Sequence, residues 1–294
     1  MPPFAAALIL TVLLFSCLSS KDVLADQRVS FPSLDGSTEL TAFLFRPNGK
    51  GPFPAVVFLH GCSGLGLGGG IAAGYTAWTR AMTGHGYVVL LVDSAGPRDF
   101  TATCNRSPDR SVMYRDRPKD AYGALVYLQA RSDVRPDRIG LAGWSQGGGI
   151  VLLSVVTESI GRPQPPPLHD FRAAVAFYPG ACSETRQSAP YTDVSPGTWF
   201  TDIPLLVLQG EADNWTPAAP CAALIESARS RGAPVKIKIY PDALHSFDVP
   251  NLARRERPRD RTSTGVVPMV GSDPIARSDA LERVPAFFDR YLKN

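Results

Sequence analysis

The stretch Gly143-Trp144-Ser145-Gln146-Gly147 places a serine between two glycines, directly after an apolar run typical of a buried strand. Where a strand turns sharply into a helix, the serine of the turn takes a strained backbone conformation. The residues two before and two after that serine must then be almost free of side chains, and glycine meets this requirement. The apolar segment 148–156 predicts a helix buried against a sheet. The pattern therefore predicts a nucleophilic serine at position 145.

An acid and a base follow this serine in the chain order that a nucleophile elbow requires. The apolar run 203–209 predicts a buried strand just before Asp213, and the alternating run 235–240 predicts a strand that leads to His245. A serine hydroxyl needs a base whose pKa lies near the working pH, which histidine supplies, and a carboxylate fixes the imidazole tautomer. The predicted triad is therefore Ser145, Asp213 and His245, all just past the carboxyl ends of strands.

Other acids remain as alternatives to Asp213. Glu211 lies in the same loop, and Asp242 and Asp248 flank the predicted base, although a solvated surface charge is the plainer interpretation of each. The remaining histidines do not follow the acid in the chain: they lie in a turn, at the start of a strand and in a proline-rich connector (His60, His85 and His169). The base is therefore assigned to His245.

Backbone donors for an oxyanion are expected in two places. The apolar run 55–59 predicts a strand that ends in a loop with the sequence His-Gly-Cys-Ser-Gly at 60–64. In enzymes with an elbow serine, N–H groups of this loop and of the residue after the nucleophile stabilise the tetrahedral oxyanion. We predict that the N–H groups of Cys62 and Gln146 are these donors, with Ser63 as an alternative to Cys62.

Three segments of the sequence resemble the dienelactone hydrolase family of α/β-hydrolases. They are the elbow at 143–148, Gly-Glu-Ala-Asp-Asn-Trp-Thr-Pro at 210–217 and Tyr-Pro-Asp-Ala-Leu-His-Ser-Phe at 240–247, and the resemblance covers nearly the whole chain after residue 28. It implies the α/β-hydrolase fold, an α/β class with a mostly parallel central sheet and helices on both faces. The founding members use a cysteine nucleophile and a glutamate in the loop after the third strand, where this chain has Ser145 and His-Gly.

The resemblance also implies an activity. Serine members of the group resemble general carboxylesterases, so we expect cleavage of a carboxylic ester or lactone bond in a small-molecule substrate through an acyl-enzyme, with no metal or organic cofactor. Within enzymes, the alternative is acyl transfer or peptide cleavage by the same triad. From a different class, the alternative is a non-catalytic binding protein on a hydrolase scaffold. Degenerate relatives usually lose a triad member, whereas this chain keeps all three.

Three side chains are candidates for contact with the substrate. Trp144 lies beside the nucleophile and Trp215 beside the acid, so both are placed to line an apolar or aromatic pocket, with packing in the core as an equal alternative. Arg98 lies in the loop after the fourth strand, where related dienelactone enzymes hold an arginine that faces the substrate carboxylate; a salt-bridged or surface arginine is the alternative. The polar loop 183–201 is expected to cover the pocket.

The glycine-rich segment 64–70 also spells the G-x-G-x-x-G pattern of dinucleotide-binding proteins, and Asp93 ends the next predicted strand. A dinucleotide fold starts its glycines in the turn that ends the strand, whereas four residues separate Leu59 from Gly64. The density of glycines also makes a chance match easy. We therefore expect a glycine-rich loop at the mouth of the pocket.

Length and charge agree with one globular domain at 26–294. A chain of 294 residues has a size at which α/β folds often form a single unit. The net charge of +3 is small and gives no argument for nucleic acid. The arginine-rich run 254–261 contains its own acids and a proline, so it predicts a solvated loop.

The first residues predict a signal peptide at 1–25. Residues 4–18 are apolar but too few for a comfortable membrane span, and residues 23–25 supply a small-x-small cleavage pattern. The segment 14–17 faintly resembles a lipoprotein box, but the bulky Phe15 disfavours lipidation. The chain is therefore expected to be secreted or periplasmic, without a stable membrane span once the signal is removed.

Export makes disulfides the expected state of the cysteines. Removal of the signal leaves four of them, an even set with three possible pairings. Cys62 and Cys104 follow two strands that are neighbours in the expected fold, and Cys182 and Cys221 follow another neighbouring pair, so these pairs need only short reaches. We predict the bridges Cys62–Cys104 and Cys182–Cys221; four unpaired buried thiols are the alternative.

Hydrophobic periodicity predicts the remaining elements, and the sequence contains no internal repeat. They are an edge hairpin at 29–31 and 40–45, strands at 87–92 and 173–178, and helices at 72–82, 116–132, 217–230 and 278–292.

Overall fold

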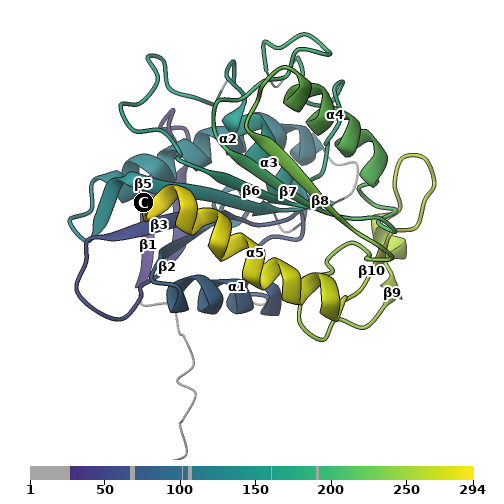
Figure 1. The fold of residues 1–294 in the computed structure, drawn as a ribbon, viewed down its shortest axis with the longest axis horizontal. Helices are drawn as coiled ribbons and strands as arrows, with labels where there is room; N and C mark the ends of the chain where they lie inside the picture. The colour runs from purple at the N-terminus through teal and green to yellow at the C-terminus, as the bar shows by residue number, and fades with distance from the viewer. Residues whose placement is uncertain (1–26, 67–69, 101, 105–107, 160, 190–191) are drawn as a thin grey trace, which may run out of the picture.

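The computed structural model describes residues 27–66, 70–100, 102–104, 108–159, 161–189 and 192–294. The predicted signal peptide and the alternative lipoprotein box lie outside these residues, so both stay predictions. Figure 1 shows the described part of the chain as a central sheet between layers of helices.

An eight-stranded sheet runs through the molecule in the order β1-β2-β4-β3-β5-β6-β7-β8. The predicted hairpin lies at one edge, where β1 pairs antiparallel with β2 and β2 pairs antiparallel with β4. All other neighbours in this sheet are parallel, which confirms the predicted α/β-hydrolase architecture. The strands are β1 (Gln27–Pro32), β2 (Glu39–Phe45), β3 (Phe53–Leu59), β4 (Val88–Asp93), β5 (Val134–Trp144), β6 (Ala174–Phe177), β7 (Leu205–Gly210) and β8 (Val235–Tyr240).

Helices cover both faces of the sheet (Figure 1). One face carries α1 (Ala73–Gly84) and α5 (Pro274–Leu292); the other carries α2 (Pro108–Gln129), α3 (Gln146–Val155) and α4 (Ala218–Ser230). Helix α2 begins earlier than the predicted residue 116. It starts at Pro108, a residue type that fits the first turn of a helix. The first turns carry no apolar stripe, so the sequence does not reveal this part of the helix. Within the described residues, no helix has the length and apolar character needed to cross a membrane.

The apolar side chains of the central strands alternate between two cores. On β3, Val57 and Leu59 join the core beneath α2, α3 and α4, whereas Val56 and Phe58 join the core beneath α1 and α5. Burial of both faces explains why parallel strands read as continuous apolar runs. All ten residues of α3 are buried, as the apolar sequence after the elbow predicts.

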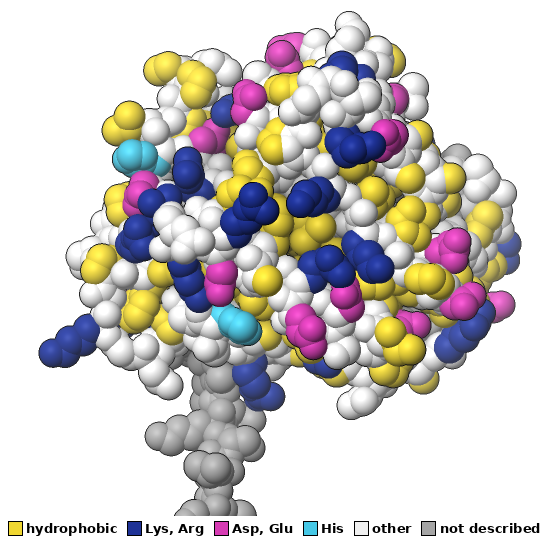
Figure 2. Space-filling view, viewed as in Figure 1, with side chains coloured by type: hydrophobic (Ala, Val, Ile, Leu, Met, Phe, Trp, Pro, Cys, Tyr) yellow, Lys and Arg dark blue, Asp and Glu magenta, His cyan; other side chains and the backbone are white. Residues whose placement is uncertain are grey.

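The other edge of the sheet is β8, which lies at the front in Figure 1. Lys236 and Lys238 alternate along it with the half-buried Ile237 and Ile239. Figure 2 shows Lys and Arg side chains around an apolar area on this side of the molecule. Charged side chains on an edge strand disfavour pairing with another sheet, so this edge is protected against aggregation.

Smaller elements complete the described structure. Two short 3-10 helices lie at Gly96–Arg98 (η1) and Pro258–Asp260 (η2). A two-stranded ribbon joins β9 (Arg255–Glu256) to β10 (Met269–Val270), and β10 forms a bridge to His245. This ribbon therefore holds the segment 254–270 beside the carboxyl ends of the sheet strands.

Candidate active site

Ser145 lies between the end of β5 and the start of α3, in the strained turn that the sequence predicts. Its backbone has φ 54° and ψ −115°, a conformation that costs a non-glycine residue about 1–3 kcal/mol. A side-chain carbon at Gly143 would overlap the carbonyl of Gly147, and one at Gly147 would overlap the carbonyls of Leu59 and His60. Close packing of strand and helix therefore requires both glycines. The N-terminus of α3 follows directly, so its dipole favours negative charge beside the serine.

His245 and Asp213 form a buried pair just past the ends of β8 and β7. Atom Nδ1 of His245 lies 2.7 Å from Oδ2 of Asp213, and both side chains are almost fully buried. The other carboxylate oxygen, Oδ1, accepts the backbone N–H groups of Trp215 and Thr216 at 2.8 and 2.9 Å. The structure thus brings the predicted base and acid together and holds the carboxylate in one orientation.

Thr216 also belongs to this site, although it was not among the predicted site residues. Its hydroxyl donates to Oδ2 of Asp213 at 2.7 Å and lies 3.2 Å from Nδ1 of His245. The available signal was the Asp-x-x-Thr spacing, because an aspartate in such a turn accepts backbone N–H groups shortly after it in the chain. The alternative acids Glu211 and Asp242 are exposed to solvent and do not share this arrangement.

Ser145 lies where two cavities meet. The polar cavity has a volume of about 620 Å³ and the aromatic cavity about 590 Å³. Ser145, Cys62 and Trp215 line both of them. The polar cavity is further lined by Gln146, Ser183, Arg186, Asn214, Arg261 and Thr262, and the aromatic cavity by Tyr75, Trp144, Tyr178, His245 and Leu252. A nucleophile in this position has room for one part of a substrate on each side.

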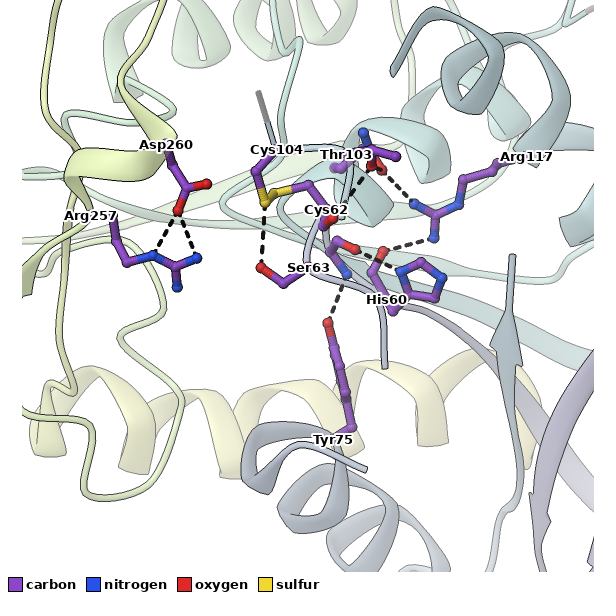
Figure 3. Close-up of a disulfide and its surroundings, with 11 residues drawn as sticks. His60, Cys62, Ser63, Tyr75, Thr103, Cys104, Arg117, Arg257 and Asp260 are labelled. Atoms are coloured by element: carbon purple, nitrogen blue, oxygen red, sulfur yellow. Dashed lines mark hydrogen bonds and ion pairs between the residues drawn. A yellow bond between two sulfur atoms is a disulfide. The ribbon is translucent and has the colours of Figure 1, made fainter. Parts of the chain in front are cut away.

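The two predicted oxyanion donors, Cys62 and Gln146, both border the polar cavity beside the serine. Thr103 links their chain segments, since its N–H donates to the Cys62 carbonyl at 2.7 Å and its hydroxyl donates to Oε1 of Gln146 at 3.0 Å. The buried Arg117 donates to the same Oε1 at 3.1 Å and to the His60 carbonyl at 2.7 Å (Figure 3). These bonds hold the two segments at a fixed spacing.

His60 is neutral, with a defined tautomer. Burial, together with the nearby Arg117 guanidinium, holds the pKa of His60 well below its usual range. The backbone N–H of Ser94 donates to Nε2 at 3.2 Å, so the ring proton is on Nδ1, which donates to the Gly61 carbonyl at 2.6 Å. Burial lowers the pKa of Arg117 to about 10, which leaves it charged near neutrality. His60 therefore holds the loop in place.

The structure contains both predicted disulfides, Cys62–Cys104 and Cys182–Cys221. The pairing follows from the sheet, because β3 lies beside β4 and β6 lies beside β7. The Ser63 hydroxyl lies 3.4 Å from the sulfur of Cys104 (Figure 3). The first bridge therefore ties the loop of the predicted oxyanion donor to the loop after β4.

We expect Cys104→Ser, or mild reduction of the native protein, to lower kcat before the fold is lost. A displacement of about 1 Å in a catalytic group can cost about 10²-fold in rate, and the bridge restrains the loop against such a displacement. The matched control is Cys221→Ser, which should mainly lower Tm because it removes a constraint on the unfolded chain. Steady-state kinetics and thermal unfolding of both variants measure the difference. An equal loss of kcat in the two variants would contradict a specific role for the first bridge.

Asp248 is a buried acid between the walls of the aromatic cavity. Its carboxylate accepts the indole N–H groups of Trp78 and Trp144 at 2.7 and 2.8 Å and the hydroxyl of Tyr178 at 2.7 Å. Burial raises the pKa of Asp248 in spite of these donors. Trp144 directly precedes the predicted nucleophile, and the Tyr178 ring lies 4.5 Å from that of His245. Asp248 therefore fixes the side chains beside both groups and is not the partner of the base.

Asp248→Ala should lower the free energy of unfolding by about 3–5 kcal/mol, because it leaves three buried donors without an acceptor. Asp248→Asn should retain most of the stability. Its amide oxygen can accept both indole N–H groups, and the Tyr178 hydroxyl can turn to accept from the amide nitrogen. Denaturant unfolding of the wild type and the two variants makes the comparison. If alanine and asparagine destabilise equally, the three hydrogen bonds do not provide the stability assigned to them.

The three predicted substrate contacts have different outcomes. Trp215 lines both cavities and packs against the His245 ring at 4.8 Å. Trp144 lines the aromatic cavity and is also part of the core. For Arg98 the structure favours the alternative, a salt-bridged arginine: it is not among the described residues that line either cavity, and its guanidinium makes two 2.8 Å hydrogen bonds to Asp120. A fully buried carboxylate needs a cation, so this arginine is used within the fold.

Three loops border the cavities. Part of the glycine-rich segment lines the aromatic cavity through Gly64, Gly66 and Gly70, in agreement with a loop at the pocket mouth, while 67–69 lie outside the described residues. The predicted covering loop 183–201 contributes Ser183 and Arg186 to the polar cavity. The arginine-rich run 254–261 is largely exposed and reaches both cavities.

In the described part of the chain, no cluster of three or more His, Cys, Asp or Glu side chains is arranged to hold a metal ion.

Comparison with known proteins gives a family match and a fold match. The model of the dienelactone hydrolase family matches residues 40–292. A Bradyrhizobium protein named "probable 2-oxo-3-(5-oxofuran-2-ylidene)propanoate lactonase" is 26% identical over 217 residues, covering 70% of this chain and 78% of that protein. Human dipeptidyl peptidase 8 is 26% identical over 250 residues, covering 75% of this chain, and the chain spans only 26% of that protein's length. The structure of Thermogutta terrifontis esterase 2 phosphoramylated by tabun matches with a TM-score of 0.62 and 18% identity, over 92% of this chain and 97% of that chain.

Proposed function

Because this chain belongs to the dienelactone hydrolase family, we propose that it is a carboxylic ester hydrolase, which cleaves ester or lactone bonds through a Ser145-His245-Asp213 triad. One observation carries the proposal. Ser145, on its strained turn, lines the aromatic cavity together with His245, whose other ring nitrogen is bonded to Asp213. This arrangement provides a nucleophile, a base and an orienting acid at one place.

In the first step, the Ser145 hydroxyl attacks the carbonyl carbon while Nε2 of His245 takes its proton. Asp213 holds the imidazole in the tautomer that leaves Nε2 free to accept, and it stabilises the imidazolium that forms. The carbonyl electron pair moves to oxygen, and this oxyanion accepts the N–H groups of Cys62 and Gln146. The positive end of the α3 dipole favours the same charge.

In the second step, the oxyanion collapses and the bond to the leaving oxygen breaks. The imidazolium of His245 gives its proton to that oxygen, and the acyl group remains on Ser145. Water then attacks the acyl-enzyme with the same base, and a second oxyanion collapses to release the acid and restore the serine. In a lactone the acid and alcohol leave as one hydroxy acid.

The two cavities divide an ester substrate into its halves. His245 must reach the leaving oxygen, and it lines the aromatic cavity, so the alcohol part is assigned to that cavity and the acyl part to the polar cavity. Benzyl acetate and methyl phenylacetate are isomers that place the same ring on opposite sides of the ester. We expect a higher kcat/KM for benzyl acetate. The reverse preference would exchange the two assignments.

A hydrolysis screen tests the reaction type. It compares p-nitrophenyl esters of increasing acyl length, alkyl esters and five- and six-membered lactones, with Ser145→Ala as the control. Ester or lactone turnover that depends on Ser145 supports the proposal, and turnover that persists in Ser145→Ala contradicts it. The similarity to human dipeptidyl peptidase 8 adds peptide cleavage as a second candidate. An aminoacyl p-nitroanilide and the p-nitrophenyl ester of the same acyl group separate the two, with the ester expected to be faster.

We also propose that the chain is exported after removal of residues 1–25. Two disulfides support this proposal, because such bonds form and persist in oxidising compartments. N-terminal sequencing of the mature protein from a bacterial host with an oxidising periplasm should find a start near Asp26. An intact N-terminus on protein held in the cytoplasm would contradict it.

A further inference from the structure

A side chain from α1 contacts the loop of the predicted oxyanion donor. The hydroxyl oxygen of Tyr75 accepts the backbone N–H of Gly61, the residue directly before Cys62, at 2.7 Å. Figure 3 shows Tyr75 extending from its helix to this loop with the oxygen at its tip. Its ring also packs edge-on against Trp144, with ring centroids 5.5 Å apart. The Tyr75 side chain is therefore held in place at two points: its hydroxyl oxygen is bonded to the loop, and its ring packs against Trp144.

This hydroxyl lies on the side of the loop that faces the nucleophile. Tyr75 lines the aromatic cavity together with Ser145, Cys62 and His245. A side-chain carbon placed on Gly61 would lie 3.5 Å from the Tyr75 oxygen and 3.5 Å from Cβ of Ser145, so both atoms flank the same point of the loop. An atom that binds near this point is within reach of both residues.

The proton of the Tyr75 hydroxyl is not used in its bond to the loop. A phenol has one proton to donate and lone pairs to accept, and the Gly61 N–H occupies a lone pair. A hydroxyl that accepts a hydrogen bond becomes a better donor, because linked hydrogen bonds polarise one another. Burial raises the pKa of Tyr75 to about 12, so the proton is retained at neutral and moderately alkaline pH. The cavity is thus provided with a neutral donor.

We propose that the Tyr75 hydroxyl is a third donor in the oxyanion hole, beside the N–H groups of Cys62 and Gln146. This role rests on the proposed function and adds a side chain to its machinery. When Ser145 bonds to the carbonyl carbon, the carbonyl electron pair moves to oxygen. That oxygen then accepts the Tyr75 O–H, and the proton stays on the tyrosine throughout.

Tyr75→Phe removes the donor but also removes the acceptor of the Gly61 N–H, so a rate on one substrate does not separate the two roles. A pair of substrates does: an oxygen ester and its thionoester, in which C=S replaces C=O. Sulfur is a weak acceptor, so the thionoester gains little from a hydroxyl donor. Loss of one oxyanion donor should lower kcat/KM for the oxygen ester about 10²-fold and for the thionoester less than about threefold. The wild-type preference for the oxygen ester should therefore collapse.

An equal fall on both substrates would overturn the proposal and leave Tyr75 as a residue that only holds the loop. Tyr240→Phe is the matched control, since its hydroxyl donates to Asp279 at 2.7 Å and it is not among the described residues that line either cavity; both rates should stay unchanged. If Tyr75→Phe does not fold, 3-fluorotyrosine at position 75 keeps both hydrogen bonds but strengthens the donor. It should raise the preference for the oxygen ester, and no change would overturn the proposal. Activity retained by Ser145→Ala would instead refute the proposed function, whatever the result at Tyr75.

Discussion

Ser145→Ala should lower kcat by about 10⁴–10⁶-fold with little change in Tm, because it removes the attacking oxygen and leaves the fold intact. The positive φ of this position is set by the packing of β5 against α3, and alanine meets the same backbone strain as serine. The matched control is Ser154→Ala, a buried serine on α3, the helix that follows Ser145, whose hydroxyl donates to the Ile150 carbonyl at 2.8 Å. Only the change at 145 should abolish turnover. Comparable losses in both variants would show that disturbance of α3 explains the effect.

His245→Ala should reduce kcat about as much as Ser145→Ala, because the members of a triad act as a unit. Asp213→Asn should reduce it by at least about 10²-fold, since an amide can hold the imidazole in the wrong tautomer. Steady-state kinetics on a common ester measure both variants.

Glu211→Gln is the control for the acid, because Glu211 lies in the same loop but is exposed. It should leave kcat unchanged. If Glu211→Gln were inactive while Asp213→Asn remained active, the acid would be misassigned despite its 2.7 Å bond to His245.

The fold was predictable because its main signals are local. Glycines two residues before and after Ser145 indicate close contact between a strand and a helix, and the structure shows that a side chain at either position would overlap the backbone. Continuous apolar runs indicate strands that are buried on both faces. The start of α2 was not predicted because this local signal is absent there: its first turns carry no apolar stripe that would indicate a helix.

The parts of the site that could be predicted are those in which chain order sets the geometry. Asp213 and His245 each follow a strand of one parallel sheet, so the ends of those strands bring them to the same rim. The two disulfides could be predicted on the same ground. Thr216 could also have been found, because its spacing from the acid is that of a local turn.

Contacts between side chains from separate elements, such as those from α1 to the loops at the strand ends, could not be predicted from the sequence. Asp248 is bonded to side chains from α1, from the end of β5 and from the residue after β6, and Tyr75 reaches from α1 to the loop of the predicted oxyanion donor. These contacts depend on how a helix is rotated on the sheet, which periodicity does not determine to within a single residue. For Arg98 the sequence suggested a salt bridge as one alternative but could not identify its partner, the buried Asp120.

The most direct test of the proposed mechanism is peptide mass spectrometry of the protein after reaction with a fluorophosphonate. A nucleophile activated by a neighbouring base should displace fluoride and keep the phosphonyl group as a covalent adduct. We predict one adduct, on the peptide that contains Ser145, and none on the same peptide of Ser145→Ala. An adduct on a different residue of the wild type, or undiminished labelling of Ser145→Ala, would contradict the assignment of Ser145 as the nucleophile.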